Sequence, residues 1–188
     1  MDRQEQVSKP TIFVTVGTDH HPFDRLLAWV DDWLANRARG KVHCFVQSGT
    51  SRPPRQAEWK DYLRYEEMEE AIGHATVVVC HGGPGTIMDV RHRGLVPIVV
   101  PRLSRLGEHV DDHQVAFTKR IAAVGAIRLA GSPEQLMELL DRAVLDPDEF
   151  RAPPAEQEAA EAVRRFEKLV ENLMETPSKA RLQLGRAS

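Results

Sequence analysis

The chain has 188 residues, of which 41% are hydrophobic and 28% charged, and its formal net charge is −3. These proportions predict one soluble globular domain with a tail and exclude a chain drawn to nucleic acid by its overall charge. No run approaches the ~20 apolar residues of a membrane span, and residues 1–10 lack the apolar core of a signal peptide, so we expect neither.

The first half of the chain alternates between strand and helix patterns. A short β-branched run at residues 11–16 ends at Gly17 and predicts a buried strand. Residues 23–38 repeat apolar side chains at helical spacing, and residues 41–47 predict a second strand. The acidic stretch 66–70 predicts a short helix that ends near residue 73.

The second half continues the alternation. Residues 75–80 predict a strand, the HGGPG sequence at 81–85 predicts a loop, and residues 86–93 predict a helix ended by Gly94. A strand, a helix, a strand and a helix are then expected at 95–100, 111–124, 126–129 and 132–145. Ser132 and Pro133 are typical residues for the start of the last helix.

This alternation predicts an α/β fold, a Rossmann-like parallel sheet with helices on both faces. Ligands of such sheets bind beyond the carboxyl ends of the strands. Loops 17–23, 47–50 and 81–86 lie there and are the candidate binding loops.

Three segments are expected along the chain. Residues 10–150 form the globular domain, residues 151–175 an amphipathic helix and residues 176–188 a flexible tail, with a linker over 146–154. The apolar stripe of that helix either packs on the domain or contacts a partner. Its members are Ala159, Val163, Phe166, Val170 and Leu173.

The two cysteines, Cys44 and Cys80, each lie inside an apolar run. They are therefore predicted to be buried free thiols, which fits a reducing, cytoplasmic location.

The loop from His81 to Thr86 joins a buried strand to a helix. Its glycines let the backbone approach a ligand, and the helix N-terminus offers free N–H groups to a phosphate. A tight turn without a ligand is the alternative. The chain has neither the G-x-S-x-G elbow of a serine hydrolase nor a Gly-Lys-Ser/Thr phosphate loop.

Two further features border these loops. Asp89 lies in the helix that the Gly-rich loop opens, so it is either a ribose ligand or a solvated residue. In the sequence LGEHVDDHQ, His109 and His113 have a metal-ligand spacing, but no third ligand is evident and no metal is expected. A polar cluster that binds sugar hydroxyls is the preferred interpretation.

Other polar groups have two interpretations each. His20 and His21 either face an acceptor or lie on the surface. Arg91, Arg93, Arg102 and Arg105 form a basic group that is expected at the solvated surface, with attraction to anionic lipid or diphosphate as the alternative.

The segments ATVVVCHGGPGTIMDVRHRGLVPIVVPR and EHVDDHQ, with FVTVGTDHHPFDRL near the start, resemble the C-terminal domain of glycosyltransferase family 28. Within that family, the likeness is closer to the small soluble donor-binding subunits of two-component enzymes. It covers about residues 11–145 and implies the C-terminal half of a GT-B fold.

The resemblance implies a set of UDP-sugar-binding residues. Gly17 and Thr18 match the loop that faces the diphosphate, and Gln47, Ser48 and Met68 match positions near the nucleotide. The phosphate loop is matched by His81, Gly82, Gly83, Gly85 and Thr86. Asp89 matches the residue that holds the ribose, and the motif that recognises the sugar is matched by Asp112, His113 and Gln114.

The function implied is an inverting transfer from a UDP-sugar to a lipid-linked acceptor, without a cofactor. A membrane-associated GT-B N-terminal subunit would supply the acceptor site and the catalytic base, and would recruit this chain to the cytoplasmic face of the membrane. The alternative is a non-catalytic nucleotide-sugar-binding regulatory protein.

Overall fold

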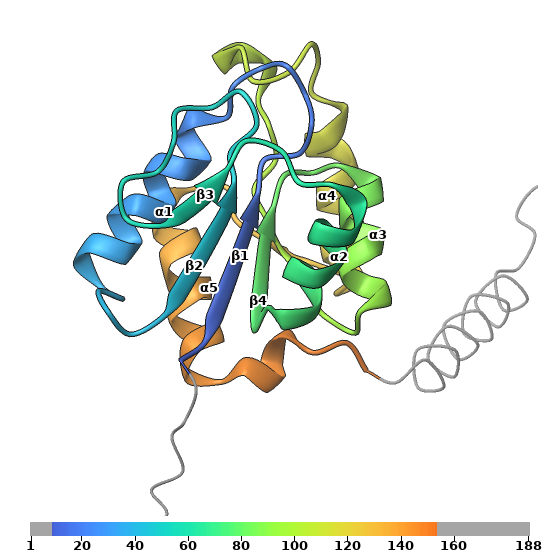
Figure 1. The fold of residues 1–188 in the computed structure, drawn as a ribbon. Helices are drawn as coiled ribbons and strands as arrows, with labels where there is room; N and C mark the ends of the chain where they lie inside the picture. Colours follow the sequence, from blue (N-terminus) through green and yellow to red (C-terminus); the bar gives the residue numbers. More distant parts are fainter. Residues whose placement is uncertain (1–8, 154–188) are drawn as a thin grey trace, which may run out of the picture. The chain divides into compact units, whose positions relative to one another are not determined.

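The computed structural model describes residues 9–153, which form a six-stranded parallel sheet (Figure 1). The strand order is β3-β2-β1-β4-β5-β6, and every neighbouring pair is parallel. The strands are β1 (Thr11–Thr15), β2 (His43–Gln47), β3 (Glu58–Lys60), β4 (Val77–Cys80), β5 (Ile98–Val99) and β6 (Arg128–Leu129). The predicted Rossmann-like α/β fold is confirmed.

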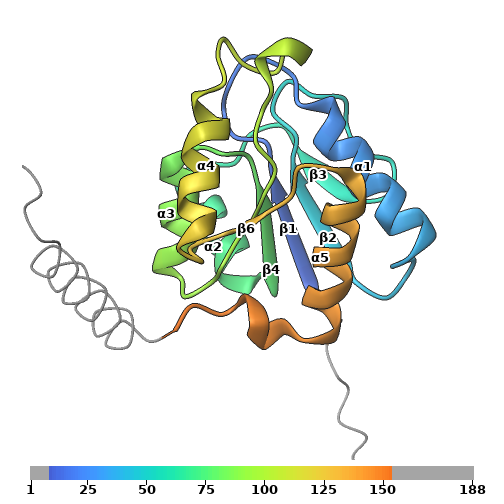
Figure 2. The same cartoon turned by 180° about the vertical axis from the view of Figure 1, so that it is seen from behind.

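Helices cover both faces of the sheet (Figures 1 and 2). Helices α1 (Asp24–Asn36) and α5 (Pro133–Leu145) lie on one face. The other face carries α2 (Tyr65–His74), α3 (Pro84–His92) and α4 (His113–Ala123). Two 3-10 helices, η1 (Ser104–Leu106) and η2 (Pro147–Phe150), complete the described elements.

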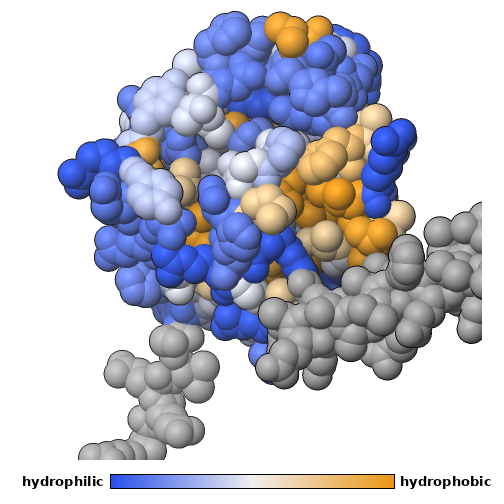
Figure 3. All heavy atoms as spheres, turned by 90° about the vertical axis from the view of Figure 1, so that its right-hand side faces the viewer, coloured by the Kyte–Doolittle hydropathy of each residue, from blue (hydrophilic) through white to orange (hydrophobic). Residues whose placement is uncertain are grey.

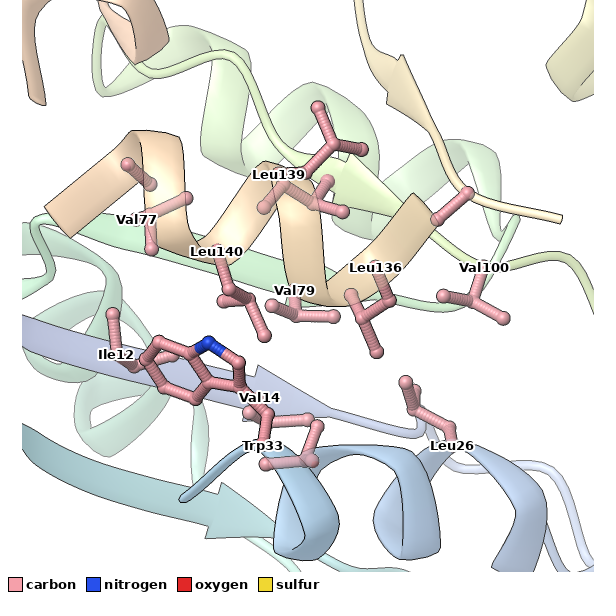
Figure 4. Packing of buried hydrophobic residues seen from close by; sticks show 14 of the residues in the cluster. Ile12, Val14, Leu26, Trp33, Val77, Val79, Val100, Leu136, Leu139 and Leu140 are labelled. Atoms are coloured by element: carbon pink, nitrogen blue, oxygen red, sulfur yellow. The ribbon is translucent and has the colours of Figure 1, made fainter. Parts of the chain in front are cut away.

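The larger core fills the space between the sheet and α1 and α5 (Figure 4). Val14 and Val79 of the central strands pack there with Leu136 and Leu140 of α5. Trp33 of α1 is 1% exposed, and its indole N–H donates to Asp141 Oδ1 at 2.8 Å. Burial of such side chains stabilises the domain by about 1.5–3 kcal/mol each.

The second core lies on the opposite face, because successive strand side chains point to opposite sides. Phe13, Val78 and Cys80 pack there against Ile72 of α2 and Ile87 of α3. Cys44 and Cys80 are both free thiols, as predicted, but only Cys80 is fully buried, whereas Cys44 is partly exposed.

Three expectations from the sequence are wrong. The sequence pattern missed strand β3 at residues 58–60, because this exposed edge strand contains no apolar run. Residues 146–152 are not a linker: Phe150 is fully buried, and Leu95 pairs with Arg151. Arg102 is fully buried rather than solvated.

The expected helix over 151–175 and the tail over 176–188 fall, from residue 154 onward, outside the described residues. Within the described part, no helix is both long and apolar enough to cross a bilayer.

An apolar surface lies on the side of the domain formed by α3 and α4 (Figure 3). Met88 of α3 is 51% exposed, Val124 directly after α4 is 55% exposed, and Phe117 and Ile121 of α4 are partly buried. Apolar surface gathered in this way is typical of a contact with another molecule or segment.

Candidate functional site

The predicted binding loops meet at the carboxyl edge of the sheet. Strands β2, β1 and β4 are adjacent, so the loops that follow them lie side by side. The chain places β2 and β3 on one side of β1, and β4, β5 and β6 on the other. The crevice beyond β1 and β4 is therefore a topological switch point, where open α/β sheets bind ligands.

Helix α3 begins in this crevice without a side-chain cap. Gly83 is the N-cap, Pro84 is the first helical residue, and the first intrahelical bond runs from Ile87 N–H to Gly83 O. The N–H groups of Gly85 and Thr86 therefore have no acceptor inside the helix. A Cβ at residue 85 would meet no atom within 4 Å, so this first turn is open to an approaching group. Free amides and the helix dipole together suit an anion.

His81 holds the β1 and β4 loops together. A Cβ at residue 17 would lie 2.4 Å from His81 Cε1, and one at residue 83 would lie 2.2 Å from His81 Nε2. The imidazole thus fills the room that Gly17 and Gly83 leave. Burial, with the nearby charge of Arg102, lowers the pKa of His81 to about 4, so the ring is neutral at pH 7.

His81 Nδ1 is buried and has no hydrogen-bond partner among the described residues. A buried polar nitrogen of this kind normally finds a partner, and a ligand or water in the crevice can supply one.

Gly82 connects the Gly-rich loop to the start of α4. A Cβ at residue 82 would lie 2.9 Å from Thr118 Cγ2 and 3.1 Å from Gln114 Cβ. Gln114 is buried, and its Oε1 atom lacks a partner among the described residues. Gly82 of the HGG motif and Gln114 of the DHQ motif, 32 positions apart in sequence, are therefore in contact.

Gln47 and Ser48 lie at the same edge but are buried and bonded to the protein. Thr15 donates its hydroxyl to Gln47 Oε1 at 2.7 Å, and Gln47 Nε2 donates to Gly17 O at 3.4 Å. The Ser48 hydroxyl lies 3.5 Å from Asp61 Oδ1. These side chains fix the β1 and β2 loops from inside. The sequence analysis did not identify Thr15 or Asp61 as residues of the site.

The remaining predicted residues lie around the crevice at different depths. Thr18 is exposed in the β1 loop, Asp89 is half-buried in α3, and Met68 is partly buried in α2 beside the second core. No described side chain caps α3, so its first turn is not blocked.

Asp112 and His113 are exposed at the start of α4. The backbone N–H of Ser104 donates to Asp112 at 2.8 Å and lowers the pKa of that carboxyl. The His113 ring is paired with Asp111. The two side chains thus present an ionised carboxylate and an imidazole at the rim.

Arg102 holds the loops of the site together through hydrogen bonds, a role that the sequence did not predict. Its guanidinium donates to Val16 O at 2.7 Å, to His21 O at 2.7 Å and to Glu108 O at 2.8 Å. A single arginine among four in a polar-looking stretch carries no sequence signal of this role. It joins the β1 loop to the loop after β5.

The charge of Arg102 also acts on Asp19. Partial burial works to raise the pKa of Asp19, but hydrogen bonds from His21 and the charge of Arg102 outweigh it and lower the pKa to about 2.

A family model for the glycosyltransferase family 28 C-terminal domain matches residues 11–173. The UDP-N-acetylglucosamine--N-acetylmuramyl-(pentapeptide) pyrophosphoryl-undecaprenol N-acetylglucosamine transferase of Acinetobacter baumannii is 32% identical over 77 residues, or 41% of this chain and 20% of that protein. The protein of the same name from Methylococcus capsulatus is 38% identical over 61 residues, or 32% of this chain and 16% of that protein.

Solved structures show the same fold. Acinetobacter baumannii MurG matches with a TM-score of 0.52 and 21% identity, over 86% of this chain and 51% of that one. The glycotransferase of kitacinnamycin matches with a TM-score of 0.56 and 18% identity, over 79% and 40%. The matched part of this chain thus corresponds to about half of each GT-B enzyme or less. With the family model matching most of its length, the chain belongs to the glycosyltransferase family 28 C-terminal domain family.

Proposed function

We propose that this chain is the donor-binding half of an inverting glycosyltransferase that moves a sugar from a UDP-sugar to a lipid-linked acceptor. The observation that carries the proposal is the uncapped start of α3, which opens to free space at the switch point of the sheet. The amides of Gly85 and Thr86 would bind the diphosphate. They would also stabilise the negative charge that grows on UDP as it leaves.

In this proposal, each of the other predicted residues binds a different part of the UDP-sugar. Gly17 and Thr18 would face the diphosphate, Asp89 the ribose and Met68 the uracil. Gln47 and Ser48 would support the nucleotide through the loop that they fix. Asp112, His113 and Gln114 would bind the sugar hydroxyls. The helix dipole would replace a metal at the diphosphate, so no cofactor is needed for this step.

The acceptor site and the catalytic base are proposed to come from a membrane-associated N-terminal GT-B subunit. The chain covers 40% and 51% of the two solved glycosyltransferases described above, which leaves room for a second domain in the active enzyme. Such a partner would also bring the chain to the cytoplasmic face of the membrane. The name of the Acinetobacter baumannii relative includes a pyrophosphoryl-undecaprenol acceptor, which motivates the lipid-linked acceptor proposed for this chain.

Donor binding is tested with a charge placed at the open turn. Gly85→Asp should not disturb the fold, because a Cβ there is in open space and a carboxylate suits a helix N-terminus. It should nevertheless repel a diphosphate. Gly85→Asn is the matched neutral control. We expect UDP at 100 times its Kd to stabilise the wild type by about 2.7 kcal/mol.

The expected ranking in thermal-shift titration with UDP is a large shift for the wild type, a smaller one for Gly85→Asn and none for Gly85→Asp. Equal shifts in Gly85→Asn and Gly85→Asp would exclude the α3 amides as the diphosphate site. A panel of UDP-glucose, UDP-GlcNAc, UDP-galactose and UDP-glucuronate would then identify the sugar.

Transfer is tested by mixing the chain with a candidate N-terminal subunit, a UDP-sugar and a lipid-linked acceptor. We expect product only when both proteins are present. Full transfer by the chain alone would refute the two-component proposal. Donor binding without transfer under any pairing would favour the regulatory alternative.

A further inference from the structure

Two loops bring four histidines and two aspartates together at the rim of the crevice. The loop after β1 carries Asp19, His20 and His21, the loop before α4 carries His109 and Asp111, and His113 is the first residue of α4. Both loops lie at the carboxyl edge of the sheet (Figures 1 and 2). We call these six residues the histidine–aspartate cluster. The sequence showed only the spacing of His109 and His113 and no third ligand.

Asp19 is the centre of one half of the cluster. Its Oδ1 lies 2.7 Å from His21 Nδ1 and 3.5 Å from His20 Nδ1, and its Oδ2 lies 3.5 Å from His109 Nε2. Two ligands on one tetrahedral zinc ion are about 3.3–3.6 Å apart, since each lies about 2.0–2.2 Å from the metal. The distance from Asp19 Oδ1 to His20 Nδ1 and the distance from Asp19 Oδ2 to His109 Nε2 match this value, so the two oxygens of one carboxylate face histidines of the two loops. The third distance, to His21 Nδ1, is a hydrogen bond that an ion would replace.

The second ring nitrogen of His109 has a partner for either tautomer. The backbone N–H of Asp111 donates to His109 Nδ1 at 3.3 Å, and the Asp111 carboxylate lies 3.6 Å from the same atom. When Nε2 binds a metal, the proton resides on Nδ1, and the carboxylate can accept it. A carboxylate behind a histidine is the usual support of a metal ligand.

The alternative group of His109, Asp111 and His113 is a weaker candidate. The side chains of Asp111 and His113 are 56% and 61% exposed, and they are already paired with each other. Asp19, His21 and His109 are 23%, 23% and 14% exposed. Three of the four residues of the Asp19 group are therefore better protected from solvent, and only His20, 83% exposed, is not.

Arg102 fixes the two loops before any ion binds. It donates to the backbone carbonyl of His21, which is itself a proposed ligand, and to that of Glu108, which precedes His109 in the chain. Its positive charge opposes a cation. A site here therefore depends on the Asp19 carboxylate and on imidazoles, whose neutral nitrogens suit zinc, copper and nickel better than calcium or magnesium.

We propose that Asp19, His20, His21 and His109 bind one divalent transition-metal ion of the zinc class, with Asp111 orienting His109. The ion would join the β1 loop to the loop before α4. It would lie beside the donor crevice and would not replace the α3 amides as the diphosphate site. The proposal does not rest on the proposed function, because metal binding is measured without any nucleotide.

The test uses the full chain with any affinity tag removed, titrated with Zn²⁺ in a calorimeter and with Co²⁺ in a spectrophotometer. We expect one Zn²⁺ per chain and the visible absorption of four-coordinate Co²⁺. The variants His20→Ala, Asp19→Asn and His109→Ala should each weaken Zn²⁺ binding at least ten-fold. His92→Ala, on the exposed end of α3, is the matched control and should bind as the wild type does.

His20→Ala keeps the test decisive even if another variant fails to fold, because the His20 side chain is 83% exposed. His113→Ala separates the two ligand groups and should leave the affinity within about two-fold. Loss of binding in His113→Ala but not in Asp19→Asn would overturn the ligand set. Absence of saturable Zn²⁺ binding by the wild type, or equal binding by His20→Ala, would overturn the site.

Discussion

The contact between His81 and Gly83 gives a direct test of how the crevice is built. Gly83 has an ordinary backbone conformation, φ −74° and ψ 125°, so alanine there creates no backbone strain. Its Cβ would nevertheless lie 2.2 Å from His81 Nε2. The imidazole cannot simply turn toward Gly17, because that residue is packed against the ring as well. Gly83→Ala should therefore destabilise the domain through this one contact.

The size of the effect follows from the overlap. An extra carbon forced into a packed site costs about 1–3 kcal/mol. For a chain of this length, a loss of 1 kcal/mol lowers the midpoint of thermal unfolding by about 2–4 °C. We therefore expect the midpoint of Gly83→Ala to fall by about 2–12 °C. Gly85→Ala is the matched control, and its midpoint of thermal unfolding should not fall, because a Cβ at residue 85 meets nothing within 4 Å.

A double-mutant cycle with His81→Ala assigns the cost to the ring. Urea unfolding is measured for the wild type, both single variants and the double variant. Once the imidazole is absent, adding Gly83→Ala should cost less than about 1 kcal/mol, which gives a coupling within the range of about 0.5–3 kcal/mol for contacting residues. An unchanged cost in the His81→Ala background, or no cost in the wild type, would refute this account of the two loops.

Three further outcomes are expected. Arg102→Leu should lower the free energy of unfolding by about 3–5 kcal/mol, because three carbonyls lose their donor, and chemical denaturation measures this. Because the pKa of His81 is about 4 in the fold and 6.5 unfolded, the unfolded state binds more protons between these values. Stability should therefore fall by up to about 3 kcal/mol as pH drops from 6.5 to 4, and His81→Asn should lose this dependence in urea titrations. Trp33→Phe should cost about 1–2 kcal/mol by thermal unfolding, since Asp141 keeps only Arg37 as partner.

The fold could be predicted because its periodic signals agree at every level. Buried β-branched runs such as residues 77–80 and amphipathic helices such as α5 each point to a covered parallel sheet. Strand β3 could not be predicted, because an edge strand of Glu, Trp and Lys needs no apolar pattern. The packing of Phe150 was also hidden, since proline and acidic residues around it resemble a linker.

The site could be predicted only as far as local sequence determines it. The Gly-rich turn before α3 is local, and the structure places it where the motif implied. The hydrogen bond from Arg102 to Val16 and the contact of Asp19 with His109 each join residues more than about 85 positions apart, so no spacing rule could reveal them. The proximity of the two motifs through Gly82 and Gln114 is of the same kind.

The glycines of the crevice meet two different requirements, and this bears on what a Gly-rich turn means. Gly17 and Gly83 are needed by the protein itself, since any side chain there would collide with His81. A ligand is not required to explain either of them. Gly85 collides with nothing, so the protein alone gives no reason for its lack of a side chain. The case for a diphosphate therefore depends on Gly85 and the uncapped amides beside it. Stability measurements should single out Gly83, and nucleotide binding should single out Gly85.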